Sequence, residues 1–215
     1  MHRYQTEFLD LALEHQVLTF GAFTLKSGRV SPYFFNLGRI ATGVGLRRLA
    51  GAYADALLAS GLSFDLIFGP AYKGIPLAAA VACALAERGV DRPFAYNRKE
   101  AKDHGEGGVL VGAPVQGARV LIVDDVLTAG TALRESHRLL TAAGATPVAA
   151  LIALDRQEVG AEGISAVQAA RQNLGLPVQA LVTVEEVMAF LKTRGGEADT
   201  IQAMIEYQAR YGVRR

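Results

Sequence analysis

The sequence predicts an α/β fold with a central, mostly parallel sheet flanked by helices. Two observations point to this class. Short apolar runs alternate with longer stretches of helical periodicity, and most of the apolar runs end in glycine or aspartate. A short apolar run bounded by turn residues is typical of a strand buried on both faces, and the alternation with helices implies right-handed crossovers. At 215 residues, one domain with a sizeable core is expected over 1–215.

The first part of the chain is predicted to form a small N-terminal hood that contains a hairpin. The expected elements are a helix over 4–13, hairpin arms over 18–25 and 30–37, and a helix over 43–60. The turn between the arms carries Lys26, and Phe34 and Phe35 lie near the end of the second arm. Gly61 is the expected stop of the following helix.

The remainder of the chain supplies the sheet and its covering helices. The predicted strands are 66–68, 94–96, 120–123, 148–154 and 179–183, the last in an outer position, and apolar character also resumes at 109–111. The predicted helices are 75–88, 132–143, 165–174, 184–193 and 198–211. Residues 97–108, rich in charge and glycine, are expected to form a loop.

Composition excludes several classes of function. With 51% hydrophobic residues, 20% charged residues and a net charge of +1, we expect a globular protein without a nucleic-acid footprint. The N-terminus lacks the apolar core of a signal peptide, and the most apolar helix, 75–86, is too short to span a bilayer. Cys83 has no disulfide partner, and we expect it to be a small buried hydrophobe in a reducing cytoplasm.

The stretch 120–132 carries the strongest functional signal. Its apolar residues run directly into Asp124 and Asp125, at the strand end where open α/β sheets bind ligands. The small residues of 128–131 let backbone N–H groups converge at a helix N-terminus, which favours a phosphate. An ordinary strand–turn–helix with solvated acids is the alternative. We favour a sugar phosphate, because one of two adjacent carboxylates must face apolar neighbours.

Two further stretches are ambiguous by themselves. The loop 69–74 has glycines at both ends, which let the backbone approach an anion, and Lys73 adds a charge suited to phosphate. Taken alone, the loop is better explained as a strand–helix connector with an exposed lysine. Composition makes 97–108 a solvated loop, whereas its lysines and His104 would also suit a lid that closes on anionic ligands.

Together these stretches resemble the orotate phosphoribosyltransferases, which belong to the type I phosphoribosyltransferase family. The similarity is carried by 23–29 with 31–36, by 69–76, by 98–108, by 120–132, and by Asp155 with Arg156. The resemblance implies transfer of the 5-phosphoribosyl group from 5-phosphoribosyl 1-pyrophosphate (PRPP) to orotate, giving orotidine 5′-phosphate and pyrophosphate in pyrimidine (UMP) biosynthesis. Charge then develops at the ribose and on the leaving group, as in glycoside chemistry.

The resemblance also implies roles for individual residues. Catalytic residues are Lys102, His104, Asp124 and Asp125. The implied PRPP site comprises Lys26, Tyr72, Lys73, Arg98, Lys99, Lys102, His104, Asp124, Asp125, Val126, Leu127, Thr128, Ala129, Gly130, Thr131 and Ala132. The implied orotate site comprises Phe34, Phe35, Thr128 and Arg156, with Arg156 pairing the substrate carboxylate, ideally in bidentate fashion. Mg²⁺ is expected to be held mainly by PRPP near the two aspartates, and a homodimer is expected to share lid residues between subunits.

Two other functions stay open at this point. One is a transferase of the same fold that acts on another nucleobase, which would lack a carboxylate partner such as Arg156. The other is a PRPP-binding regulatory protein that binds nucleic acid, which would need a basic face. The near-neutral charge and the presence of Lys102 and His104 favour catalysis.

Overall fold

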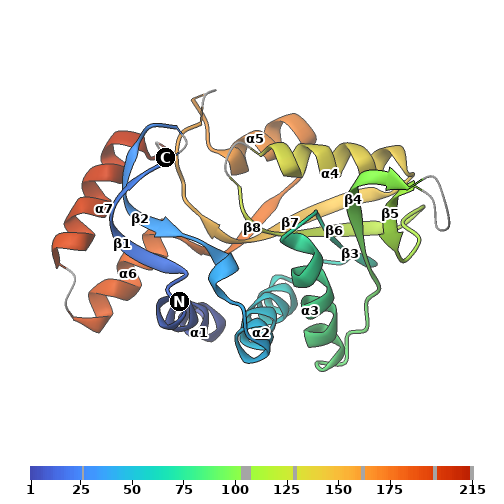
Figure 1. Ribbon diagram of the computed structural model, residues 1–215, viewed down its shortest axis with the longest axis horizontal. Coiled ribbons are helices and arrows are strands. Elements are labelled where there is room, and N and C mark those ends of the chain that lie inside the picture. Colours follow the sequence, from blue (N-terminus) through green and yellow to red (C-terminus); the bar gives the residue numbers. More distant parts are fainter. Residues whose placement is uncertain (26, 103–107, 128–129, 161–162, 196–197, 214–215) are drawn as a thin grey trace.

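The computed structural model describes residues 1–25, 27–102, 108–127, 130–160, 163–195 and 198–213. In this part of the chain a six-stranded sheet has the order β5-β4-β3-β6-β7-β8 (Figure 1). Its strands are β3 (Leu66–Gly69), β4 (Phe94–Lys102), β5 (Gly108–Gly112), β6 (Arg119–Val126), β7 (Thr146–Asp155) and β8 (Val178–Thr183). Every pairing is parallel except β4 with β5. The predicted fold class and the outer position of the last strand are confirmed.

Helices cover both faces of the sheet (Figure 1). One face carries α1 (Arg3–Glu14), α2 (Gly43–Ser60) and α3 (Gly74–Ala86), and the other carries α4 (Thr131–Ala142) and α5 (Ala166–Leu174). The buried apolar side chains accordingly form two clusters, one on each side of the strands. The chain closes with α6 (Val184–Arg194) and α7 (Ala198–Tyr211). Gly61, at φ +65°, ends α2 as expected.

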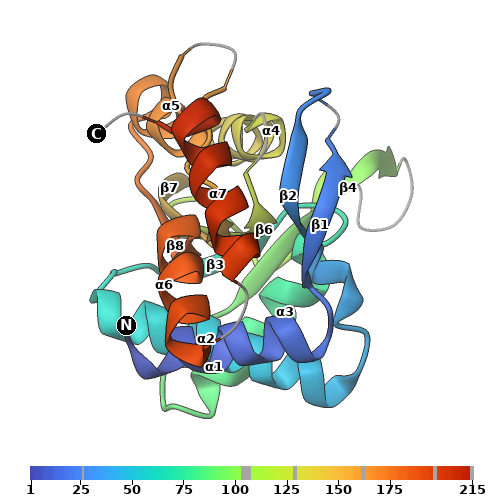
Figure 2. The same ribbon diagram turned by 90° about the vertical axis from the view of Figure 1, so that its left-hand side faces the viewer.

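The predicted hairpin stands apart from the sheet (Figure 2). It consists of β1 (Leu18–Thr24) and β2 (Val30–Phe35), which pair in antiparallel fashion. The second arm is shorter than predicted, because Asn36 turns the chain into the short 3-10 helix η1 (Leu37–Arg39) and its side chain accepts a hydrogen bond from Gly38 N at 3.1 Å. The hairpin packs against α7, where the rings of Tyr33 and Tyr207 meet edge to face at 6.4 Å.

Two expectations about the middle of the chain are wrong. Residues 97–102, expected in a loop, continue β4, where Asn97 pairs with Leu110 of β5. A half-exposed edge hairpin tolerates charged side chains that a buried strand would exclude. Cys83 is exposed, because α3 buries its Leu77, Val81 and Leu85 stripe and residue 83 lies outside that stripe.

The pairing of β6 with β7 contains an irregularity far from the strands' carboxyl ends. Val120 pairs with Pro147, whereas the next residue of β6, Leu121, pairs with Ala149, so β7 holds one extra residue, Val148. Proline has no backbone N–H to donate to the ladder, which is why such residues sit at bulges. Beyond the bulge the register is regular as far as Val126 with Leu154.

Candidate functional site

The two aspartates at the end of β6 have different surroundings. Asp125 is buried; its Oδ1 accepts a hydrogen bond from Val126 N at 2.8 Å, and its Oδ2 lies 2.6 Å from Lys73 Nζ. Asp124 accepts the N–H of Asp125 through Oδ1 at 2.8 Å, and its backbone carbonyl accepts the hydroxyl of the fully buried Tyr53, also at 2.8 Å. Burial, and then the charge of Asp125, raise the pKa of Asp124 to about 7. A cation or a hydroxyl donor beside these two carboxylates would therefore stabilise their negative charge.

The loop between β3 and α3 brings Lys73 to the aspartates. Its two glycines are required by the loop itself, because a Cβ at Gly69 would overlap the carbonyl oxygen of Gly74, and one at Gly74 would lie 2.6 Å from Pro70 Cδ. These glycines, which are predicted to let the backbone approach an anion, also let the two ends of the loop touch. Ala71 N donates to Asn97 Oδ1 at 3.0 Å, which ties the loop to β4.

Two helices begin near the carboxyl ends of β3 and β6 without a side-chain cap. The N-cap positions of α3 and α4 are Lys73, whose side chain makes no cap hydrogen bond, and Gly130, which has no side chain. By contrast, Thr42, Ser165 and Thr183 accept hydrogen bonds from the first turns of α2, α5 and α6. Uncapped N–H groups at the positive end of a helix dipole favour an anion. The Gly130–Ala132 turn therefore has the character of the predicted phosphate cradle.

The other residues of the predicted PRPP site are partly brought together. Val126 and Leu127 continue from the aspartates toward α4 and are half-buried, whereas Tyr72 is 67% exposed and Lys99 Nζ lies 4.7 Å from the centroid of its ring. Arg98 lies on β4 beside Lys99. Of Lys102 the backbone alone is described, as the last residue of β4. Lys26, His104, Thr128 and Ala129 lie outside the described residues.

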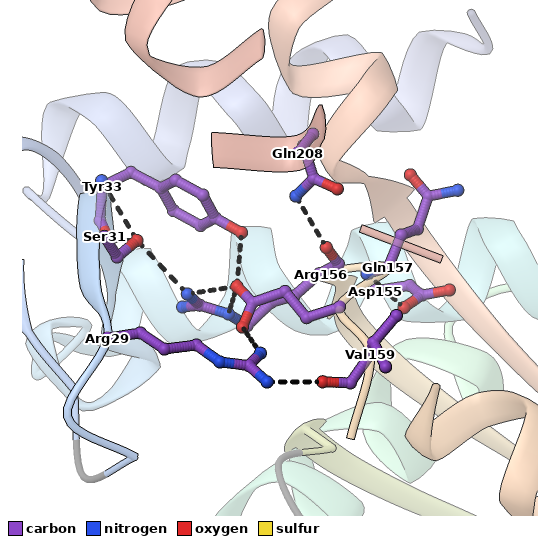
Figure 3. A network of polar contacts seen from close by, with 9 residues as sticks. Arg29, Ser31, Tyr33, Asp155, Arg156, Gln157, Val159 and Gln208 are labelled. Carbon is purple, nitrogen blue, oxygen red and sulfur yellow. Dashed lines mark hydrogen bonds and ion pairs between the residues drawn. The ribbon is translucent and has the colours of Figure 1, made fainter. Parts of the chain in front are cut away.

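At the end of β7, the residue predicted to bind the acceptor is held in a network of polar contacts (Figure 3). Arg156 approaches Glu158 Oε1 through Nε at 2.8 Å and through one terminal nitrogen, Nη2, at 2.6 Å. The same nitrogen donates to Ser31 Oγ at 3.3 Å, and the guanidinium lies 4.6 Å from the ring centroid of Tyr33. Arg29 joins the network from the hairpin, with its guanidinium 3.8 Å from Glu158.

Sequence reasoning found Arg156 but missed its partners. Glu158 follows it at a spacing of two residues, and this Arg-x-Glu pattern is the one local signal of the pair. Arg29, Ser31 and Tyr33 reach it from the hairpin, more than a hundred positions earlier in the chain, and no local pattern points to that contact.

The two phenylalanines of the predicted acceptor site divide between surface and core. Phe34 is 41% exposed and its ring packs on Phe23 at 5.6 Å. Phe35 turns inward and packs on Phe8 at 6.4 Å, against the larger core cluster. The ring of Phe34 is therefore accessible from solvent, whereas the ring of Phe35 is engaged by the core.

The carboxylates fit a magnesium ion that a substrate brings with it. Within the described residues no group of three or more metal-binding side chains converges. Among the described residues, both oxygens of Asp125 and Oδ1 of Asp124 accept hydrogen bonds from protein donors, whereas Oδ2 of Asp124 accepts none. Mg²⁺ commonly binds one or two carboxylates together with substrate phosphates, so this donor set is sufficient.

Of the described helices, none has the length and apolarity needed to cross a membrane.

Comparison with known proteins gives consistent matches along the chain. Residues 41–163 match the family model described as phosphoribosyl transferase domain. The chain is 55% identical over 214 residues to the orotate phosphoribosyltransferase of Cellvibrio japonicus, covering 99% of both chains, and 55% identical over 213 residues to that of Marinobacter nauticus, covering 99% and 100%. The crystal structure of the Francisella tularensis orotate phosphoribosyltransferase superposes with a TM-score of 0.87 at 42% identity, covering 95% of this chain and 98% of that chain.

Proposed function

The chain belongs to the orotate phosphoribosyltransferase family, and from this premise we propose how its residues divide the reaction between them. The enzyme transfers the 5-phosphoribosyl group of PRPP to orotate and releases orotidine 5′-phosphate and pyrophosphate. The main functional prediction from the sequence is thereby confirmed. The roles of individual residues, the metal and the assembly are the proposal that follows.

The donor half of the site is assigned to the ends of β6 and β3. The observation that carries this assignment is the uncapped N-terminus of α4, which begins at Thr131, a short turn after Asp124 and Asp125. We assign the 5′-phosphate to the N–H groups of 126–132, with the hydroxyls of Thr128 and Thr131, and the ribose hydroxyls to the aspartates. We assign Lys73, Tyr72 and Lys26 to the phosphates of PRPP as well.

The leaving group is assigned to the cations of β4 and of the segment that follows it. Mg²⁺, when bound with PRPP beside Asp124, neutralises charge on the departing pyrophosphate. Arg98 and Lys99 add positive charge on the same side, and Lys102 with His104 closes over the pyrophosphate and excludes water. The aspartates favour the positive charge that develops at the ribose.

A charge-removing variant tests the assignment of the lid. Lys102→Ala is expected to lower turnover at least about tenfold while PRPP still binds, because it removes a charge that acts on the leaving group rather than on the bound donor. Lys192→Ala on α6, which removes an exposed lysine elsewhere, is the matched control. Unchanged turnover in Lys102→Ala removes the lid from the mechanism.

The acceptor half is assigned to β2 and the end of β7. Arg156 pairs the carboxylate of orotate, Phe34 packs on the pyrimidine, Phe35 contributes through its backbone, and Thr128 lies where the donor and acceptor sites meet. Loss of orotate absorbance in the presence of PRPP and Mg²⁺ measures this reaction. Arg156→Met is expected to raise the KM for orotate strongly and the KM for PRPP little; equal changes in both refute the assignment.

Three properties of the whole molecule belong to the same proposal. We assign a single catalytic domain, a homodimer in which lid residues of one subunit serve the site of the other, and a cytoplasmic location. The single cysteine of the sequence, Cys83, supports the last of these, because disulfides are rare in the reducing cytoplasm. Sedimentation of the purified protein, with and without PRPP, tests the dimer.

A further inference from the structure

We propose that Glu158 is a positioning residue for the acceptor: it holds the guanidinium of Arg156 so that one defined edge is left for the carboxylate of orotate. The proposal rests on the assignment of Arg156 to the orotate carboxylate, and it adds a residue that does not itself contact the substrate. The carboxylate of Glu158 contacts Arg29 and Tyr33 of the hairpin on one side and Arg156, at the end of β7, on the other.

Some N–H groups of the Arg156 guanidinium bind protein atoms, and the others are available to a ligand. Nε and Nη2 both point to the same oxygen of Glu158, at 2.8 and 2.6 Å, and Nη2 also donates to Ser31. Among the described residues, Nη1 makes no hydrogen bond. A guanidinium carries five N–H donors in a fixed plane, so fixing Nε and Nη2 fixes the direction of Nη1. We therefore assign the carboxylate of orotate to this terminal nitrogen.

The guanidinium is fixed by more than one contact. It lies against the ring of Tyr33, whose hydroxyl also donates to Glu158 at 3.4 Å, and the backbone carbonyl of Arg156 accepts the side-chain N–H of Gln208 from α7 at 3.1 Å. The side chains of Arg156 and Glu158 are only 13% and 14% exposed. Charge-assisted hydrogen bonds in such surroundings are strong, so the orientation of the guanidinium depends on Glu158.

A purely structural role for Glu158 would look different. A carboxylate that served only to fasten the hairpin to the body would rely on Arg29, yet Arg29 lies at 3.8 Å from Glu158 and instead donates to the carbonyl of Val159 at 2.9 Å. The short contacts of Glu158 go to Arg156. Arg29 consequently offers a matched control, because its removal loosens the same hairpin without releasing Arg156.

The test compares binding of two nucleotides that differ by one carboxylate, orotidine 5′-phosphate and uridine 5′-phosphate, by calorimetry without turnover. Glu158→Gln keeps the size of the side chain and removes its charge. We expect it to weaken binding of orotidine 5′-phosphate about tenfold, the effect of about one charge-assisted hydrogen bond, and to change binding of uridine 5′-phosphate less than about twofold. Arg29→Met is expected to leave the ratio of the two affinities unchanged.

A double-mutant cycle separates this proposal from the one on which it rests. In an Arg156→Met background, Glu158→Gln is expected to have no further effect on the ratio, because it acts through Arg156. Additive effects, an equal loss for both nucleotides, or the same loss in Arg29→Met each overturn the positioning role. If Arg156→Met itself leaves the ratio unchanged, the assignment of Arg156 fails instead. Thermal unfolding of every variant verifies that the compared proteins are folded.

Discussion

The raised pKa of Asp124 predicts that this carboxylate makes the ligand-free protein less stable as the pH rises. Its pKa rises from the ordinary 3.8 to about 7 because the group is largely removed from water and lies beside Asp125. The folded state therefore keeps a proton that the unfolded chain loses above about pH 4, and the free energy of unfolding falls as the pH rises from about 4 to about 7. Above about pH 7 the free energy of unfolding has fallen by the full amount.

The size of the effect follows from the difference of about three pH units. At about 1.36 kcal/mol for each unit, the ionised side chain costs at most about 4 kcal/mol. Asp124→Asn removes the ionisation and keeps an oxygen that accepts the N–H of Asp125. We therefore expect the variant to be more stable than the parent at pH 8, by up to about 4 kcal/mol, and to lose this advantage near pH 4, while orotate turnover falls strongly.

Urea unfolding of the ligand-free proteins across this pH range measures the difference directly. Asp91→Asn, at an exposed position between α3 and β4, serves as the control for replacing any carboxylate by an amide. A stability difference that is the same at every pH would show that the effect of Asp124→Asn does not come from its charge. A variant less stable than the parent at pH 8 would refute the reasoning outright.

Two further variants probe the scaffold around the aspartates. Gly69→Ala is expected to destabilise the protein by about 3 kcal/mol or more, because its Cβ would overlap the carbonyl oxygen of Gly74, whereas Gly43→Ala, with open space around it, should be close to neutral in thermal unfolding. Tyr53→Phe leaves the carbonyl of Asp124 without its hydroxyl donor in a fully buried place, and a loss of about 1–3 kcal/mol in urea unfolding is expected; no loss would mean that another donor replaces it.

Much of this fold could be predicted from the sequence because local patterns and tertiary structure agree. The helix 43–60 and its stop at Gly61, and the strand that ends at the aspartates, follow from periodicity and turn chemistry. The length of β4 could not be predicted, because its charged residues disfavour a strand until β5 pairs with them. Cys83 was misjudged because its neighbours are apolar, and burial there depends on which side of α3 meets the sheet.

The site shows the same division between local and distant information. The aspartates, Lys73 and Arg156 are recognisable because each follows directly from a strand or opens a helix. The contact of Glu158 with the hairpin joins positions more than a hundred residues apart, and a glutamate in a polar stretch gives no sign that it is buried. Local patterns therefore predicted which residues reach this edge, whereas the orientation of Arg156 required the tertiary structure.

The extra residue in β7 sets how far Arg156 lies along the sheet from Asp124 and Asp125. Because Val148 is absorbed before the regular pairing begins, Asp124 aligns with Ile152 and the strand runs on to Asp155. A strand advances about 3.3 Å per residue, so removing the bulge would slide Arg156 by that distance relative to the aspartates and turn alternate side chains to the other face. The spacing between the aspartates and Arg156 is thus set near Pro147, at the opposite end of the two strands.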